Sequence, residues 1–165
     1  MTDPTTQLQT EHDEDDTQTG KFLTFLIGTD VYGIEIRYVT EIIGIQAITE
    51  VPELPEHIRG IINLRGKIIP VMDVRLRFKK PFRDYNDRTC IVVVDLSEVS
   101  IGLIVDSVSE VVQIAEEDIV PPPDLKSGNP QGFIKGVGKV GGEIKLLLDG
   151  DKLLQHEEAE HLSHL

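Results

Sequence analysis

Short apolar runs, separated by glycine and proline, dominate the chain from Lys21 onward. The runs KFLTFLI at 21–27 and CIVVVDL at 90–96 have the length and density expected of strands buried on both faces. VYGIEI at 31–36 alternates large apolar side chains with Gly33 and Glu35, which is typical of a half-buried strand. Because Ile, Val and Leu are abundant and aromatic residues make up only 5% of the chain, the pattern predicts mainly β-structure.

Towards the C-terminus, GFIKGVGKVGGEIKLLLD at 132–149 predicts two strands joined by a turn at Gly141–Gly142. DKLLQHEEAEHLSHL at 151–165 predicts a short C-terminal helix, followed by a tail over 156–165. Residues 1–20 are polar, acidic and poor in apolar side chains, so we expect a disordered N-terminal tail.

The sequence also matches itself, first at an offset of 69 residues and later at an offset of 76. The first offset pairs Gly33 with Gly102, Val39 with Val108, Glu41 with Glu110 and Pro52 with Pro121, and the second pairs Ile58 with Ile134, Gly60 with Gly136, Gly66 with Gly142 and Asp73 with Asp149. Glycine and proline recur in order, which indicates an internal duplication. We therefore expect two related β-modules, at about 21–80 and about 88–150, each closing five short strands into a small barrel.

Arg65 stands out because the repeat does not reproduce it. Its counterpart at the second offset is Gly141, so the turn before Gly66 does not itself demand an arginine. A residue present in only one copy needs a reason other than the shared fold, and guanidinium groups suit protein interfaces.

Composition narrows the possible functions. The single cysteine, Cys90, excludes a disulfide framework and a cysteine zinc site. A net charge of −13 disfavours general binding to nucleic acid or to anionic membranes. We find no apolar run long enough to span a bilayer and no secretory signal, so we expect a cytoplasmic protein without direct membrane insertion.

Charge is unevenly distributed within the β-rich region. Residues 59–88 hold nine basic and three acidic side chains, whereas residues 106–124 hold six acidic side chains and no Lys or Arg. This distribution fits either ordinary solvated faces or two patches of opposite sign for two partners.

The sequence contains motifs seen in catalytic and cofactor-binding sites, but their surroundings in the sequence do not support those functions. Gly136-x-Gly138-x-x-Gly141 has the dinucleotide-binding spelling, but a strand follows it instead of a helix. His161 and His164 have helical spacing for one metal, but no further ligand completes a site. We therefore predict no catalytic residues, no metal site, no cofactor and no enzymatic activity.

Four segments carry a family resemblance: FLIGTDVYGIEIRYVTEII at 25–43, HIRGIINLRGKIIPVMDVRLRF at 57–78, GLIVDSVSEVV at 102–112 and FIKGVGKVGGEIKLLLD at 133–149. Over about 21–155 the chain resembles the CheW family of chemotaxis coupling proteins. The resemblance implies an all-β fold with minor helix, made of two five-stranded SH3-like barrels. It also implies an adaptor that joins the cytoplasmic tips of methyl-accepting chemoreceptors to the regulatory domain of the histidine kinase CheA, recruited to membrane receptor arrays.

Carried over by position, the resemblance assigns partner binding to six residues. Val39, Glu41 and Arg65 are expected to line or border the receptor and kinase surfaces, and Gly102, Val108 and Val111 are expected to support or form those contacts. Since Val39 and Ile42 are the repeat partners of Val108 and Val111, a purely structural role stays open for both valines of the second half.

Other functions also stay open. The chain fits a CheW-like paralogue that serves another motility or sensory pathway. A barrel that binds single-stranded nucleic acid would use the basic stretch with Phe78, Phe82 and Tyr85 as stacking platforms. A hydrolase that uses metal at the tail histidines is a third alternative.

Overall fold

The computed structural model describes residues 18–122 and 132–154. The predicted acidic tail over 1–20 lies almost wholly outside these residues, and the predicted tail over 156–165 lies outside them entirely. The strands are β1 (Lys21–Ile27), β2 (Asp30–Glu35), β3 (Val39–Gly44), β4 (Ile58–Leu64), β5 (Lys67–Asp73), β6 (Cys90–Leu96), β7 (Val99–Val105), β8 (Ser107–Gln113), β9 (Ile119–Val120), β10 (Ile134–Val140) and β11 (Glu143–Leu148). Short helical turns are η1 (Ile36–Tyr38), α2 (Val74–Arg77), η2 (Glu116–Asp118) and α3 (Gly150–Leu153).

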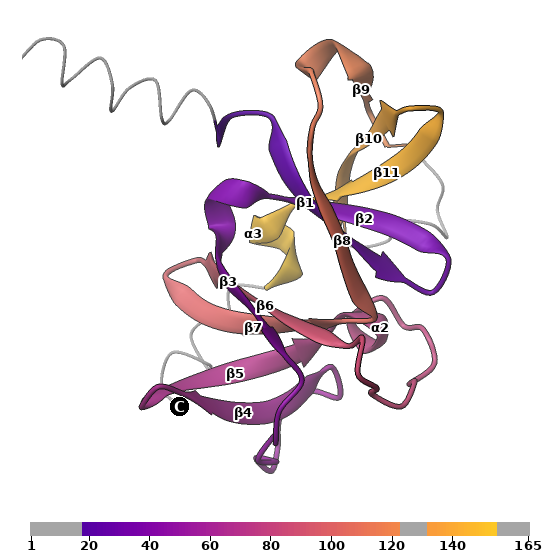
Figure 1. Cartoon of the computed structure of the whole chain (residues 1–165). Helices are drawn as coiled ribbons and strands as arrows, with labels where there is room; N and C mark the ends of the chain where they lie inside the picture. The colour runs from indigo at the N-terminus through magenta and orange to yellow at the C-terminus, as the bar shows by residue number, and fades with distance from the viewer. Residues whose placement is uncertain (1–17, 123–131, 155–165) are drawn as a thin grey trace, which may run out of the picture.

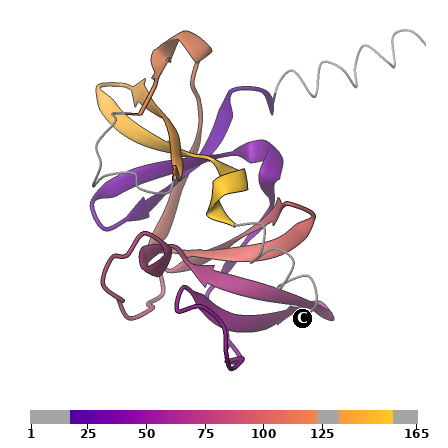
Figure 2. The same cartoon turned by 180° about the vertical axis from the view of Figure 1, so that it is seen from behind.

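The strands form two sheets, one above the other (Figure 1). The six-stranded sheet has the order β8-β1-β2-β11-β10-β9, and the five-stranded sheet has the order β3-β6-β7-β5-β4. Seen from behind, α2 and α3 both lie at the level where the sheets meet (Figure 2). The mainly β fold with minor helix is therefore confirmed, including two related sheets and a short helical turn after the last strand.

The sheets do not coincide with the two halves of the sequence. The hairpin β1–β2 from the first half completes the six-stranded sheet, while the hairpin β6–β7 from the second half completes the five-stranded sheet. This exchange differs from the predicted barrels at about 21–80 and about 88–150. The repeat pattern cannot reveal it, because equivalent hairpins carry the same apolar pattern and fit either set of partners.

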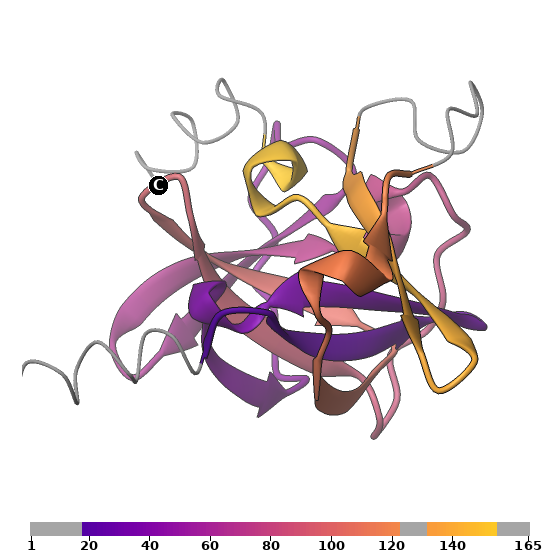
Figure 3. The ribbon, with the colours of Figure 1, turned by 90° about the horizontal axis from the view of Figure 1, so that it is seen from above.

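Each sheet curves back toward its own edge. In the six-stranded sheet, β8 and β9 are edge strands that follow each other along the chain through η2. In the five-stranded sheet, Thr49 follows β3 and pairs with Ile61 of β4 at the other edge, with both N–O distances 2.9 Å. The view from above looks down through the upper sheet onto the lower one (Figure 3). This curvature gives each sheet an interior and an open end.

Within the part of the chain that the structure describes, three apolar clusters stabilise the fold. The largest lies between the sheets and combines side chains from both, among them Phe25, Ile34, Val94 and Leu103. A second cluster fills the interior of the five-stranded sheet, and a smaller third cluster around Phe22 and Leu147 fills the interior of the six-stranded sheet. Because the shared core involves both sheets, the fold is one packed unit. Among the residues described, no helix has the length and apolar character needed to cross a membrane.

Candidate functional site

The β4–β5 turn presents Arg65 at the surface. Arg65 and Gly66 occupy its two central positions with φ of 53° and 87°, the signs that a type I′ hairpin requires. The Gly66 N–H donates a 2.8 Å hydrogen bond to Asn63 Oδ1, which closes the turn. The equivalent turn in the other half uses Gly141 and Gly142 at φ 57° and 82°. A positive φ destabilises the backbone at an arginine but not at a glycine. The geometry of the turn therefore does not explain why residue 65 is an arginine.

A β-bulge on β3 separates two predicted site residues. Val39 pairs with Val94 whereas Glu41 pairs with the adjacent Val93, and the Thr40 hydroxyl donates to the Val93 carbonyl at 3.1 Å. Residues two apart normally share a face of a strand, but a bulge breaks that rule. Val39 therefore packs against the shared core, while Glu41 lines a shallow cleft at the open end of the five-stranded sheet.

Glu41 and Arg65 meet at this cleft. Arg65 Nη2 donates to Glu41 Oε1, and the two side chains are 73% and 28% exposed. An ion pair this exposed contributes little to stability. It does hold a guanidinium and a carboxylate at defined positions on the surface.

The rest of the cleft has a polar rim and an apolar floor. Lys67 Nζ donates to Ser100 Oγ at 2.9 Å, and Ser100 Oγ donates to Asp95 Oδ1 at 2.7 Å. Buried Ile69 and Val93 form the floor. This arrangement suits contact with a protein surface that offers both charged and apolar groups.

The other predicted residues lie elsewhere. Gly102 is buried on β7, where an added Cβ would stand 2.6 Å from a methyl of Ile91. Val108 is half-buried on β8 and packs against the shared core, as its repeat partner Val39 does. Val111 is 51% exposed on the same strand. The structure thus brings Glu41 and Arg65 together, and it gives Gly102 a position inside the sheet.

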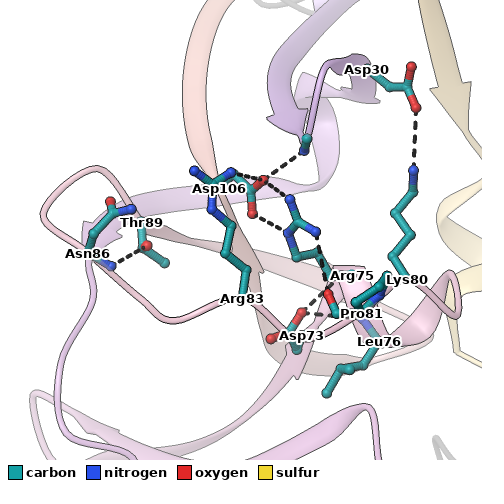
Figure 4. Close-up of polar contacts among 11 residues, drawn as sticks. Asp30, Asp73, Arg75, Leu76, Lys80, Pro81, Arg83, Asn86, Thr89 and Asp106 are labelled. Atoms are coloured by element: carbon teal, nitrogen blue, oxygen red, sulfur yellow. Dashed lines mark hydrogen bonds and ion pairs between the residues drawn. The ribbon is translucent and has the colours of Figure 1, made fainter.

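A second polar cluster joins the two sheets where β7 continues into β8 (Figure 4). Asp106 lies at this crossover and accepts two hydrogen bonds from Arg75, at 2.8 and 2.7 Å, and one from the Gly28 N–H at 2.7 Å. Arg83 approaches the same carboxylate at 3.5 Å. Burial raises the pKa of Asp106, but the hydrogen bonds from Arg75 and Gly28 outweigh this effect and leave the pKa below its ordinary value.

Sequence reasoning missed this cluster, although the repeat contained a signal. At the offsets of 69 and 76, Asp106 falls on Arg37 and Arg75 falls on Asp151, so the repeat has charges of the opposite sign at the equivalent positions. Arg75 and Arg83 belong to the basic stretch, and Asp106 belongs to the acidic one. These members of the two stretches bind each other, so they do not form separate patches for two partners.

The aromatic residues of the basic stretch are mostly engaged within the fold. Phe78 packs between Tyr32 and Phe133, and the Tyr85 hydroxyl donates to Asp73 at 2.7 Å. Phe82 is 46% exposed. Within 18–122 and 132–154, no group of three or more His, Cys, Asp or Glu side chains is placed to hold a metal ion, and the tail histidines lie outside these ranges.

Comparison with known proteins places these features in a family. Residues 21–158 match the CheW-like domain. The chain is 35% identical over 138 residues to the chemotaxis protein CheW of Klebsiella aerogenes, covering 84% of this chain and 83% of that protein. It is 30% identical over 149 residues to the chemotaxis protein CheW of Treponema pallidum, with 88% of each covered. The crystal structure of the scaffolding protein TtCheW from Thermoanaerobacter tengcongensis superimposes with a TM-score of 0.77 at 37% identity, covering 82% of this chain and 92% of that one.

Proposed function

Because this chain belongs to the CheW family of chemotaxis scaffold proteins, we propose that it couples methyl-accepting chemoreceptors to the regulatory domain of the histidine kinase CheA. In this role it works without catalysis, in the cytoplasm, and is recruited to receptor arrays at the membrane. Two partners require separate contact surfaces on one rigid body, and the shared core supplies that rigidity.

The observation that carries the proposal is the Glu41–Arg65 pair at the open end of the five-stranded sheet. Arg65 keeps a conformation that glycine would adopt at lower cost, and its ion pair is too exposed to repay that cost in stability. A binding role accounts for an arginine at this position, since arginine is frequent among the residues that dominate interface energetics. Glu41 orients the guanidinium and supplies a carboxylate to the same surface.

The remaining site residues take supporting roles in this proposal. Val111, exposed on β8, offers apolar surface on the other sheet. Val39 and Val108 fix the edge strands β3 and β8 against the shared core. Gly102 allows β7 to pass closely between Ile91 and Val71.

The test is reconstitution with a receptor signalling fragment and CheA. The full chain is expected to bind both and to raise kinase activity above that of the kinase and receptor alone. Arg65→Ala is expected to weaken binding to at least one partner about tenfold. Lys139→Ala, which changes an exposed cation on β10 of the other sheet, serves as the matched control and is expected to behave as the parent. Absence of binding to both partners, with no effect on the kinase, would refute the proposal.

A further inference from the structure

Two equivalent rows of side chains, one at the open end of each sheet, have opposite polarity. In the five-stranded sheet, Asp95 of β6 pairs with Ser100 of β7, Ile69 of β5 pairs with Ile62 of β4, and the cleft brings Asp95, Ser100 and Ile69 together. In the six-stranded sheet, Leu26 of β1 pairs with Val31 of β2, and Lys145 of β11 pairs with Gly138 of β10. Val31 and Lys145 directly precede Tyr32 and Leu146, through which β2 pairs with β11. The offsets of 69 and 76 map each member of one row onto the corresponding member of the other.

The comparison shows where each sheet is polar. The polar residues Asp95 and Ser100 of the five-stranded sheet correspond to the half-buried apolar residues Leu26 and Val31 of the six-stranded sheet. Buried Ile69, the floor of the Glu41–Arg65 cleft, is replaced by Lys145. The six-stranded sheet therefore has apolar side chains at the positions where the other sheet is polar, and a cation at the position where the other sheet is apolar.

Lys145 is an unusual residue for this position. Its side chain is only 5% exposed, and a buried ammonium is costly unless it is well paired. Its Nζ lies 2.8 Å from Glu143 Oε2, but the Glu143 side chain is 72% exposed. Such a carboxylate is well solvated and gains little from the pair. An ammonium can donate three hydrogen bonds, and Glu143 accepts one of them.

We propose that the open end of the six-stranded sheet is a docking site for a protein partner that inserts one acidic side chain onto Lys145. The incoming carboxylate replaces Glu143, and an apolar group beside it packs on Leu26 and Val31. The Glu143 carboxylate beside Lys145 repels further negative charge, so the site favours a single carboxylate over an acidic stretch. This site is separate from the Glu41–Arg65 cleft and does not depend on the proposed coupling function.

Two capped peptides test the site on the full chain: acetyl-Leu-Glu-Leu-amide and the matched acetyl-Leu-Gln-Leu-amide. NMR of the Lys145 side chain and of the Leu26 and Val31 methyl groups reports binding as each peptide is added. We expect saturable shifts from the glutamate peptide with a dissociation constant of about 1 mM, and about tenfold weaker binding of the glutamine peptide.

Two variants separate docking from a merely structural role. Lys145→Ile introduces the residue type found at the equivalent position Ile69. The variant is therefore expected to fold and to lose the preference for the glutamate peptide. Glu143→Gln removes the internal competitor and is expected to strengthen binding of the glutamate peptide. Equal binding of both peptides, no shift at Lys145 up to about 10 mM peptide, or unchanged binding in Lys145→Ile would each overturn the proposal.

Discussion

At the scale of single residues, Arg65 separates binding from folding. Replacement by glycine relieves the positive φ, so Arg65→Gly is expected to keep or raise the free energy of unfolding, by up to about 1 kcal/mol. Arg65→Ala retains the backbone cost and is expected to leave stability within about 0.5 kcal/mol of the parent. Urea denaturation measures both variants, and both are expected to bind a partner less tightly. A glycine variant that is clearly less stable than the parent would show that Arg65 is structural.

Gly102, in contrast, is needed for packing, because other atoms occupy the space that a side chain at this position would take. A Cβ at this residue would stand 2.6 Å from Ile91 Cγ2 and 2.9 Å from Val71 Cγ1. Gly102→Ala is therefore expected to lower the free energy of unfolding by about 1–3 kcal/mol, measured by chemical denaturation. Gly44→Ala is the matched control, because no atom lies within 4 Å of its Cβ position. If the two variants are equally stable, Gly102 is not constrained by packing.

At the scale of elements, a hydrogen bond between Tyr85 and Asp73 helps to hold the segment between α2 and β6 against the fold. Tyr85 donates to Asp73 Oδ2, while Asp73 Oδ1 accepts from the Arg75 N–H and caps α2. Burial and the bond to Asp73 raise the pKa of Tyr85. Tyr85→Phe leaves one oxygen of the buried Asp73 unsatisfied and is expected to cost about 1–3 kcal/mol of unfolding free energy.

Thermal and urea denaturation measure this cost. Asp87→Asn, an exposed change in the same segment, is the control and is expected to leave stability unaltered. A Tyr85→Phe variant as stable as the parent would mean that water satisfies Asp73 equally well.

The elements themselves were largely predictable. The dense runs at 21–27 and 90–96 coincide with β1 and β6, and the turn at Gly141–Gly142 joins β10 to β11. These features are encoded locally, by apolar density and by glycine at positive φ. The bulge that separates Val39 from Glu41 and the exchange of hairpins between sheets were not predictable, because both depend on which strand becomes the neighbour.

At the scale of the whole molecule, Asp106 makes the joining of the two sheets sensitive to acid. Its pKa is lower in the folded protein than its ordinary value of about 3.9, so its bonds to Arg75 and Gly28 stabilise the fold above that value. This contribution is lost as the pH falls through the lowered pKa. Asp106→Asn is expected to lower the free energy of unfolding at pH 6 by about 2 kcal/mol and to lose less stability than the parent on acidification.

Urea titrations at pH 6 and near pH 3 measure the difference. Asp118→Asn, which changes an exposed carboxylate of η2, is the control and is expected to keep the acid sensitivity of the parent. Identical acid sensitivity in Asp106→Asn and the parent would show that the junction does not depend on the charge of Asp106.

The site was only partly predictable for a related reason. Arg65 was identifiable because the repeat has Gly141 in its place, and its pairing with Glu41 follows from the fold. The role of Asp106 was hidden, because its partners Arg75 and Gly28 come from segments far apart in the sequence. Opposite charges along a sequence do not reveal whether they face solvent or each other.

The hairpin exchange also bears on how the protein responds to dilution. If the two modules were separate polypeptides, each would need the hairpin of the other. They would then dissociate and unfold when the protein concentration fell too low. Because both modules belong to one polypeptide, they associate within the same molecule, at an effective concentration on the order of millimolar. The chain is thus equivalent to an intertwined dimer with its subunits fused, and it stays assembled however few copies a cell makes.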